Sequence, residues 1–391
     1  MGIIQLSEVT VRRGRSTVLE KWSLSVDSGE VVCLFGENGC GKSTVIETAA
    51  GLVPMENGKS TISGQLIRDS DGRRGRTEFG LCLQDDCVMG DEIVGERLLD
   101  VAGHEFNVES LLKKWGLEHR IHDRIAMLSG GQRRKIAVLS GLIPALISDT
   151  PVAVLLDEPD SGLDEKSIDL LCNTLRDLAD GGHAVLFSSH NEKLLDFSDK
   201  KILFPFETVN NDPQKGEFSK ITTTGTRKSL VGHRLNIRTL SGVANNGVVG
   251  LIVLGAMLAL LDPNDMSSRM ETAFILAPAL AAGMAGNPVH RLTLENRAFA
   301  WWKTRSAIPL NALIHSLIVC GLLTFLASMI TTGLDLQLVI AGALLGAVTE
   351  TIVGFMSYST LSLARPNAVM IRLLTPILVL PWALVVDTLS S

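Results

Sequence analysis

The sequence has few charged residues and lacks the signals of several common protein classes. Only 20% of its 391 residues are charged, whereas 46% are hydrophobic, which is apolar for a soluble protein. Its six cysteines include no CxxC pair and no metal-ligand spacing, so we expect reduced cytosolic thiols. The N-terminus lacks the basic, then apolar, then small-residue order of a signal peptide. We therefore expect the front of the chain to stay in the cytoplasm.

The charge is divided unevenly along the chain. Residues 1–235 carry 28 Lys and Arg against 35 Asp and Glu, whereas residues 236–391 carry 8 against 7. The acidic front part offers no broad basic face, so we expect no nucleic-acid partner. The length allows two domains of ordinary size.

A glycine-rich string lies between a predicted strand, residues 29–35, and a helix that is predicted to begin at Thr44. This context is the one that a phosphate-binding loop requires. Its glycines let backbone N–H groups approach the phosphates, Lys42 supplies a positive charge to them, and the Ser43 hydroxyl can ligate Mg²⁺. The residues predicted to bind nucleotide here are Gly36, Glu37, Asn38, Gly39, Cys40, Gly41, Lys42, Ser43 and Thr44.

Two further apolar runs, 152–156 and 184–187, each end in polar residues, Asp157-Glu158 and Ser188-Ser189-His190. Apolar strands with polar residues at their carboxyl ends predict a parallel α/β sheet with its ligand crevice at that edge. Asp157 stands where a carboxylate would hold the Mg²⁺ shell. Glu158 can polarise an attacking water, and such general-base assistance contributes about 10²–10⁴-fold to the rate. We therefore expect ATP and Mg²⁺ as ligands.

The most discriminating string is Leu128-Ser129-Gly130-Gly131-Gln132. Together with the phosphate loop, Gln84, Asp157-Glu158 and His190, it resembles the nucleotide-binding domain of ABC transporters over about residues 1–205. The resemblance implies a P-loop ATPase with a helical subdomain. It also implies a head-to-tail pair, in which each ATP lies between Lys42 and Ser43 of one copy and the 129–132 string of the other.

The same resemblance assigns roles to single residues. It implies that Gln84 senses the metal beside Ser43 and Asp157 and couples to a membrane domain. His190 would contact the γ-phosphate, and Asp164 would communicate across the dimer. The predicted catalytic set is then Glu158, His190, Gln84 and Lys42. An aromatic residue that the family stacks on adenine is replaced here by Arg13, whose guanidinium plane can also stack on a base.

The last part of the chain is rich in long apolar runs. Residues 206–236 are polar and predict a linker. Three runs without charge follow, at 239–261, 272–289 and 306–334, and two apolar stretches with one charge each, at 336–364 and 367–386. A span needs about 20 apolar residues, so residues 237–391 predict an all-α transmembrane domain of about five spans. Basic and acidic loops alternate, which predicts a multi-pass protein of the cytoplasmic (inner) membrane with its ATPase domain in the cytoplasm.

This half resembles ABC-2 type permeases. On the strings 271–310 and 373–381 it is similar, more narrowly, to the membrane subunit of the haem-exporter-type ABC system of cytochrome c maturation. The resemblance implies a half-transporter in membrane lipid that works as a homodimer, or as a heterodimer with a related ABC subunit. It also implies haem export with a haem-handling partner protein. The alternatives are ABC-2 export of a lipid, polysaccharide or drug, and force transmission that releases a partner protein from a membrane complex.

Three features of this half leave two interpretations each. Residues 290–305 are amphipathic and basic and contain Trp301-Trp302, so they predict a segment that couples to the ATPase domain or a plain interfacial helix. Glu350 is a functional intramembrane carboxylate or marks a break in its helix. His315 is a haem ligand or a packing residue.

Overall fold

The computed structural model describes residues 2–204, 207–211, 215–227, 231–286, 297–304, 312–331, 333–361 and 379–390. The chain forms two compact units. The first comprises Met1–Leu230 with Asn296–Ala307, and the second comprises Val231–Glu295 with Ile308–Ser391. A short stretch between the predicted second and third spans therefore belongs to the first unit.

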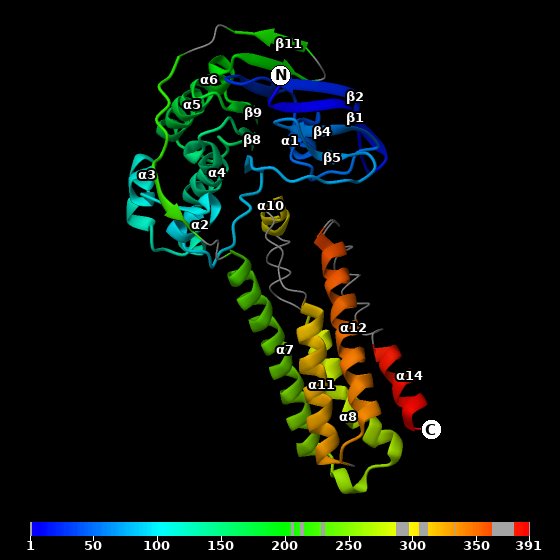
Figure 1. The fold of residues 1–391 in the computed structure, drawn as a ribbon. Coiled ribbons are helices and arrows are strands. Elements are labelled where there is room, and N and C mark those ends of the chain that lie inside the picture. Colours follow the sequence, from blue (N-terminus) through cyan, green and yellow to red (C-terminus); the bar gives the residue numbers. More distant parts are fainter. Residues whose placement is uncertain are drawn as a thin grey trace. The chain divides into compact units, whose positions relative to one another are not determined.

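A six-stranded sheet forms the centre of the first unit (Figure 1). Its order is β11-β10-β3-β9-β8-β6, and every neighbouring pair is parallel except β11 with β10. The strands are β3 (Val31–Phe35), β6 (Gly80–Cys82), β8 (Ala153–Asp157), β9 (Ala184–Ser188), β10 (Lys200–Leu203) and β11 (Glu207–Asn210). β8 and β9 are buried along their whole length, which explains their unbroken apolar runs. The predicted parallel α/β sheet is confirmed.

A second, antiparallel sheet has the order β2-β1-β4-β5. Its strands are β1 (Ile4–Arg13), β2 (Ser16–Val26), β4 (Asn57–Ile62) and β5 (Gln65–Asp69). The β1–β2 hairpin lies against the phosphate loop, because a Cβ added at Gly41 would lie 2.8 Å from Cγ1 of Val18. The hairpin is therefore one wall of the nucleotide site.

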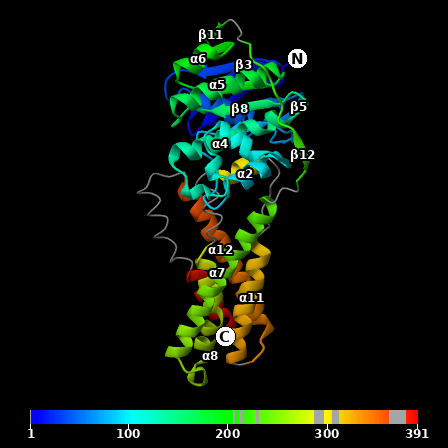
Figure 2. The same ribbon diagram turned by 90° about the vertical axis from the view of Figure 1, so that its left-hand side faces the viewer.

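Helices complete the first unit and cover the main sheet (Figure 2). They are α1 (Lys42–Ala49), α2 (Val94–Ala102), α3 (Val108–Lys114), α4 (Gly130–Ile147), α5 (Glu165–Asp180), α6 (Glu192–Phe197) and α10 (Ala298–Thr304), with 3₁₀ turns η1 (Glu118–Arg120) and η2 (Ile125–Met127). α5 buries Leu171, Leu175 and Leu178 at helical spacing, as an amphipathic surface helix should. The region between the phosphate loop and β8 thus contains the predicted helical subdomain, with one short strand, β7 (His104–Phe106).

The segment 206–236, predicted to be a linker, contains two strands of the first unit. β11 extends the main sheet, and β12 (Thr223–Thr226) pairs with β7. Arg227 then forms ion pairs with Glu96, Asp100 and Glu105 of the α2–β7 region. These are short edge strands with exposed residues, so they lack the apolar alternation by which a strand is found in a sequence.

The second unit is a bundle of helices (Figure 1). It contains α7 (Val231–Leu260), α8 (Ser268–Met284), α11 (Ala312–Ile330), α12 (Leu336–Leu361) and α14 (Val379–Ser390), with the turn η3 (Pro263–Asp265). Three segments are long and apolar enough to cross a membrane: Leu240–Leu260, Leu313–Ile330 and Leu336–Met356. α8 has 17 residues and contains Pro278, and α14 has 12. The described residues therefore support three of the five predicted spans by length, and residues 362–378 of the last two apolar stretches lie outside them.

Helices α8, α11 and α12 pack at close range. A Cβ added at Gly346 of α12 would lie 2.3 Å from the sulfur of Cys320 on α11 and 2.9 Å from the carbonyl oxygen of Ala279 on α8. Glu350 lies inside the continuous helix α12, is buried, and accepts a hydrogen bond from Ser316 of α11. The interpretation that the helix breaks at Glu350 is therefore wrong: a neighbouring hydroxyl partners the carboxyl group inside the bundle.

Candidate nucleotide site

The phosphate loop joins β3 to α1 and wraps around its own lysine. Lys42 Nζ donates to the carbonyl oxygens of Gly36 at 2.8 Å and Glu37 at 3.0 Å. Gly39 and Gly41 have φ angles of 83° and 120°, which side chains rarely tolerate. At Gly41 a Cβ would also collide with Val18. The loop thus has the backbone that lets N–H groups surround a phosphate at the start of a helix.

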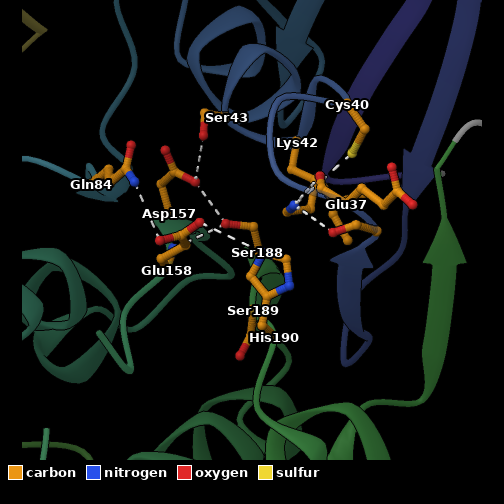
Figure 3. Close-up of polar contacts among 12 residues, drawn as sticks. Glu37, Cys40, Lys42, Ser43, Gln84, Asp157, Glu158, Ser188, Ser189 and His190 are labelled. Carbon is orange, nitrogen blue, oxygen red and sulfur yellow. Dashed lines mark hydrogen bonds and ion pairs between the residues drawn. The ribbon is translucent and has the colours of Figure 1, made fainter. Parts of the chain in front are cut away.

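Asp157 lies at the carboxyl end of β8, opposite the start of α1 (Figure 3). Its Oδ1 accepts hydrogen bonds from Ser43 Oγ at 3.1 Å and from Ser188 Oγ at 2.6 Å. Burial raises the pKa of the Asp157 carboxyl above its ordinary value of 3.8, and the two hydroxyl hydrogen bonds act in the opposite direction. The fold therefore brings together two residues predicted to hold Mg²⁺ that are far apart in the sequence.

Glu158 is held between two polar side chains (Figure 3). Gln84 Nε2 donates to its Oε2 at 3.3 Å, and His190 Nε2 lies 3.9 Å from its Oε1. Its backbone has a φ of 48°, a left-handed conformation that costs a non-glycine residue about 1–3 kcal/mol. Each oxygen of the carboxylate thus has its own neighbour. The structure brings together Lys42, Ser43, Gln84, Asp157, Glu158 and His190, as the motifs predict.

Two residues outside the predicted site set fix this arrangement: Ser188, expected only as a polar residue at a strand end, and Arg134. Ser188 accepts a hydrogen bond from the Glu158 N–H with its Oγ at 2.9 Å, in addition to its bond to Asp157. Arg134 is buried and donates to the carbonyl oxygens of Asp157 at 2.8 Å and Glu158 at 2.7 Å. It also donates to the backbone carbonyl of Gln84 at 3.2 Å. Arg134 lies two residues after the 128–132 string, and this closeness was the one available signal. Only the fold shows that Arg134, and not Arg133, is the buried arginine that must have acceptors.

The 129–132 string forms the start of α4. Ser129 is the N-cap, its Oγ accepts from the Gln132 N–H at 3.3 Å, and Gln132 Oε1 accepts from the Ser129 N–H at 3.0 Å. This capping box leaves Ser129 and Gly130 exposed at a helix N-terminus, where anions are favoured. A Cβ at Gly131 would lie 2.9 Å from the Gly162 carbonyl oxygen. The string is therefore packed against the 161–164 turn.

Asp164 ends that turn and caps α5. It accepts hydrogen bonds from the Ser167 N–H and hydroxyl at 2.8 Å, and Lys135 of α4 donates to it at 3.0 Å. These contacts, with the Ser167 hydroxyl first, lower the pKa of Asp164 to about 2. The residue is thus ionised at neutral pH and links α4 to α5. Its role across a dimer stays a prediction.

Arg13, predicted to stack on adenine, forms an ion pair with Glu47 of α1. Glu47 is buried and also holds Arg297, which directly precedes α10. The guanidinium of Arg13 thus reaches α1 and is bound to a carboxylate there. Its contact with a base stays a prediction.

Helix α10 is built into the first unit through two tryptophans. Trp301 and Trp302 are 1% and 2% exposed. Trp301 Nε1 donates to the carbonyl oxygen of Leu81 at 2.7 Å, on the edge strand β6. The guanidinium of Arg97 lies 4.2 Å and 4.5 Å from the two ring centroids and is paired with buried Glu92 at 3.1 Å. β6 ends at Cys82, two residues before Gln84. α10 therefore contacts the strand that leads to Gln84.

The side-chain oxygens at this site decide whether the residues present fit Mg²⁺. Within the described residues no cluster of three or more His, Cys, Asp or Glu side chains could hold a metal ion. Ser43 Oγ and Asp157 Oδ1 nevertheless meet, and Gln84, whose amide nitrogen faces Glu158, keeps its amide oxygen for another partner. Such hard oxygen donors, few in number, suit Mg²⁺, which takes its remaining ligands from water and substrate phosphate. The residues therefore fit this ion.

Two further predictions concern His315 of the second unit and the cysteine thiols. His315 is half-buried on α11. Its role as a haem ligand stays a prediction. All six cysteines are free thiols, as expected from their spacing.

Comparison with known proteins identifies the family of this chain. The profile of the ABC transporter family matches residues 19–161. The glutamate/aspartate import ATP-binding protein GltL of Escherichia coli is 32% identical over 199 residues, which cover 48% of this chain and 80% of GltL. The chain belongs to the ABC transporter family. Its first unit contains an ABC ATPase domain, and the family's ligand in this domain is ATP.

Relatives of this ABC transporter include longer proteins. A macrolide export ATP-binding/permease protein MacB of Hyphomonas neptunium is 27% identical over 341 residues, covering 75% of this chain and 51% of the relative. The Nod factor export ATP-binding protein I of Sinorhizobium fredii is 33% identical over 196 residues, covering 48% of this chain and 55% of that protein. The chain thus spans about half the length of these relatives.

Solved structures resemble part of this chain in fold. One described as the ATP binding subunit of an ABC transporter has 24% sequence identity and a TM-score of 0.45, covering 56% of this chain and 90% of its own. The dimeric cassette MJ0796 has 21% identity and a TM-score of 0.44, covering 56% and 98%.

Proposed function

We propose that this chain is a membrane-embedded, exporter-type ABC half-transporter. The observation that carries the proposal is α10. In the sequence it lies between α8 and α11 of the apolar half, yet it is packed inside the ATPase unit through Trp301 and Trp302. Any rearrangement of that unit that shifts β6 or α2 therefore pulls on a segment that continues, on both sides, into the membrane half.

The chemistry proposed for the site is ATP hydrolysis. Lys42 would leave the carbonyls of its own loop and neutralise the phosphates. Glu158 would accept a proton from the attacking water, with Gln84 and His190 holding its two oxygens in place. Ser43, Asp157 and Gln84 would hold Mg²⁺, which would neutralise charge on the β- and γ-phosphates.

A complete site requires two copies. Lys42 and Ser43 face Asp157 and the loop, whereas the exposed N-terminus of α4 presents Ser129 and Gly130 to the surface. A head-to-tail pair would place this helix end against the phosphates of the other copy. A homodimer is the simplest arrangement, and a heterodimer with a related ABC subunit is the alternative.

Export is favoured by the relative that extends into the membrane half. A match over 75% of the chain is longer than residues 1–230, so the MacB relative also aligns with part of the second unit. The import relative GltL matches only 48% of the chain. We place the ATPase unit in the cytoplasm and the apolar helices in the inner-membrane lipid. An amphipathic small molecule is the cargo class we favour, and haem is the narrower hypothesis.

A second candidate function is force transmission that releases a partner protein from a membrane complex. The close approach of α8, α11 and α12 at Gly346 and Gly283 supports it, because backbone contact closes the space between these helices at that level. In this case ATP turnover would respond to a protein partner and not to a small cargo.

The experiment is ATPase turnover of the full chain in lipid nanodiscs. Glu158→Gln is the inactive variant, and Glu192→Gln, on the exposed start of α6, is the matched control. We expect loss of turnover only in Glu158→Gln, and equal turnover in both variants would refute the proposed site. Titration with haem and with a macrolide then separates the cargo hypotheses, because only the true cargo gives saturable stimulation. Stimulation by neither favours force transmission.

A further inference from the structure

Glu47 is a buried acidic residue that the proposed chemistry does not use. It lies on α1, five positions after Lys42, and only 4% of it is exposed. Its Oε2 accepts from Arg13 and its Oε1 from Arg297. A buried carboxylate is costly unless it is paired, so these two arginines keep Glu47 inside the unit.

The two arginines come from different functional parts of the unit. Arg13 pairs in register with Ser16 on the hairpin whose Val18 touches the phosphate loop, and its side chain is 48% exposed. Since the phosphates occupy the loop, the nucleoside must lie outside it, beside a wall such as this hairpin. Arg297 directly precedes α10, the helix that carries Trp301. One carboxylate thus connects the nucleoside side of the site to the segment that leads to the membrane helices.

The charges at Glu47 make the two contacts dependent on each other. Two guanidinium groups around one carboxylate repel, and charges that meet at a buried carboxylate are screened less by salt and water than a fully exposed pair. Withdrawal of one arginine therefore strengthens the hold on the other. Because linkage is reciprocal, a firmly held Arg297 makes Arg13 easier to withdraw toward a nucleotide.

We propose that Glu47 is a positioning residue through which the nucleoside part of a bound nucleotide strengthens the attachment of the 297–304 segment to α1. The nucleotide attracts Arg13, and Glu47 then pairs with Arg297 alone. The inference rests on the proposed function only in requiring that residues 36–44 bind nucleotide. Neither hydrolysis nor transport is needed for it.

The test is a competition experiment with the full chain in nanodiscs, without Mg²⁺ so that turnover is suppressed. A fluorescent nucleotide, TNP-ATP, is displaced by ATP or by inorganic tripolyphosphate. The ratio of the two dissociation constants reports the nucleoside contribution, because tripolyphosphate has the phosphates alone. Arg297→Ala is compared with Arg297→Lys, which keeps the charge, and with Arg12→Ala, an exposed neighbour of Arg13 that pairs with Glu56.

We expect Arg297→Ala to raise the dissociation constant of ATP about 5-fold or more, which is the lower range of allosteric couplings. The dissociation constant of tripolyphosphate should be unchanged. Arg297→Lys and Arg12→Ala should stay near the wild type. In a Glu47→Gln background, Arg297→Ala should have no further effect on ATP. An Arg13→Ala background should give the same result, which keeps the test valid if Glu47→Gln does not fold.

Two results would overturn the inference. One is an Arg297→Ala effect of equal size with and without Glu47, and the other is equal weakening of ATP and tripolyphosphate. A wild-type chain that fails to bind TNP-ATP would overturn the proposed function as well. Normal binding without coupling would overturn this inference alone.

Discussion

The replacement Arg134→Met tests how the carboxylate of Glu158 is held. Arg134 is 4% exposed, and its guanidinium donates to four backbone carbonyl groups. These carbonyls belong to two segments, Leu83-Gln84 and Asp157-Glu158, that contain two of the proposed metal ligands and the proposed base. Methionine has a similar length and no donor. The variant therefore removes the link between the segments without replacing any side chain of the segments themselves.

The expected magnitude follows from these contacts. Hydrogen bonds to charged groups contribute about 1.5–3 kcal/mol each, but those of one side chain do not add independently. Breaking a buried charged interaction typically costs about 3–5 kcal/mol, so we expect a loss of about 3–5 kcal/mol in the free energy of unfolding. Glu158, strained at φ 48°, should then relax. A displacement of about 1 Å can cost about 10²-fold in rate, so we expect turnover to fall about 10²-fold.

The assay is thermal unfolding of the full chain in nanodiscs, with ATPase turnover measured at a temperature where all variants are folded. Arg133→Met is the matched control, because Arg133 is adjacent on the same helix, is 43% exposed and pairs with Asp86 only at 3.5 Å. Such a surface pair contributes about 0–1 kcal/mol. Equal stability and turnover of the two variants would show that Arg134 does not hold Glu158.

Three further predictions follow from single contacts. Trp301→Phe removes the donor to Leu81 and should lower the free energy of unfolding by about 0.5–1.5 kcal/mol. Trp302→Phe should not, because its indole nitrogen has no hydrogen-bond partner among the described residues. Equal shifts in unfolding temperature would contradict this. Burial lowers the pKa of His183 below 6.5, and its Nδ1 accepts from the Val152 N–H. The neutral ring therefore stabilises the fold fully above pH 6.5, and this contribution falls as the pH drops, by up to about 1.4 kcal/mol per pH unit. His183→Leu should be less stable than the wild type at pH 7.5, but its melting temperature should decline less steeply toward pH 5.5. An unchanged slope would be evidence against this protonation. Ser316→Ala should lower the stability of the bundle by about 0.6–1.7 kcal/mol, whereas Glu350→Gln, which keeps an acceptor, should leave unfolding near the wild type; a large loss in Glu350→Gln would mean that the charge itself is needed.

The division between what sequence and structure reveal is clearest at the nucleotide site. Residues 36–44 and 128–132 are contiguous strings whose chemistry depends on local backbone shape, so they could be found without coordinates. The parallel sheet was also predictable, because strands buried on both faces have unbroken apolar runs. Asp157 and Glu158 followed from their place at the end of such a run. Each of these features is encoded by neighbours in the chain.

Contacts between distant residues required the fold. Arg134 differs from Arg133 in the sequence by nothing except position, and only the packing of α4 against β6 and β8 decides which one is buried. The same holds for Arg13, whose adenine role was implied by the family resemblance but whose partner in the structure is Glu47, 34 residues away.

The membrane half shows the same division. Apolar runs predicted where its helices lie, because the bilayer requires length and hydrophobicity that a sequence displays directly. Its composition could not tell whether Glu350 interrupts a helix or is buried inside one, and the Ser316 hydroxyl on another helix decides this. Nor could amphipathicity distinguish an interfacial helix from one packed in the ATPase unit. That choice depends on Arg97 and the free edge of β6, which come together with Trp301 only through the tertiary fold.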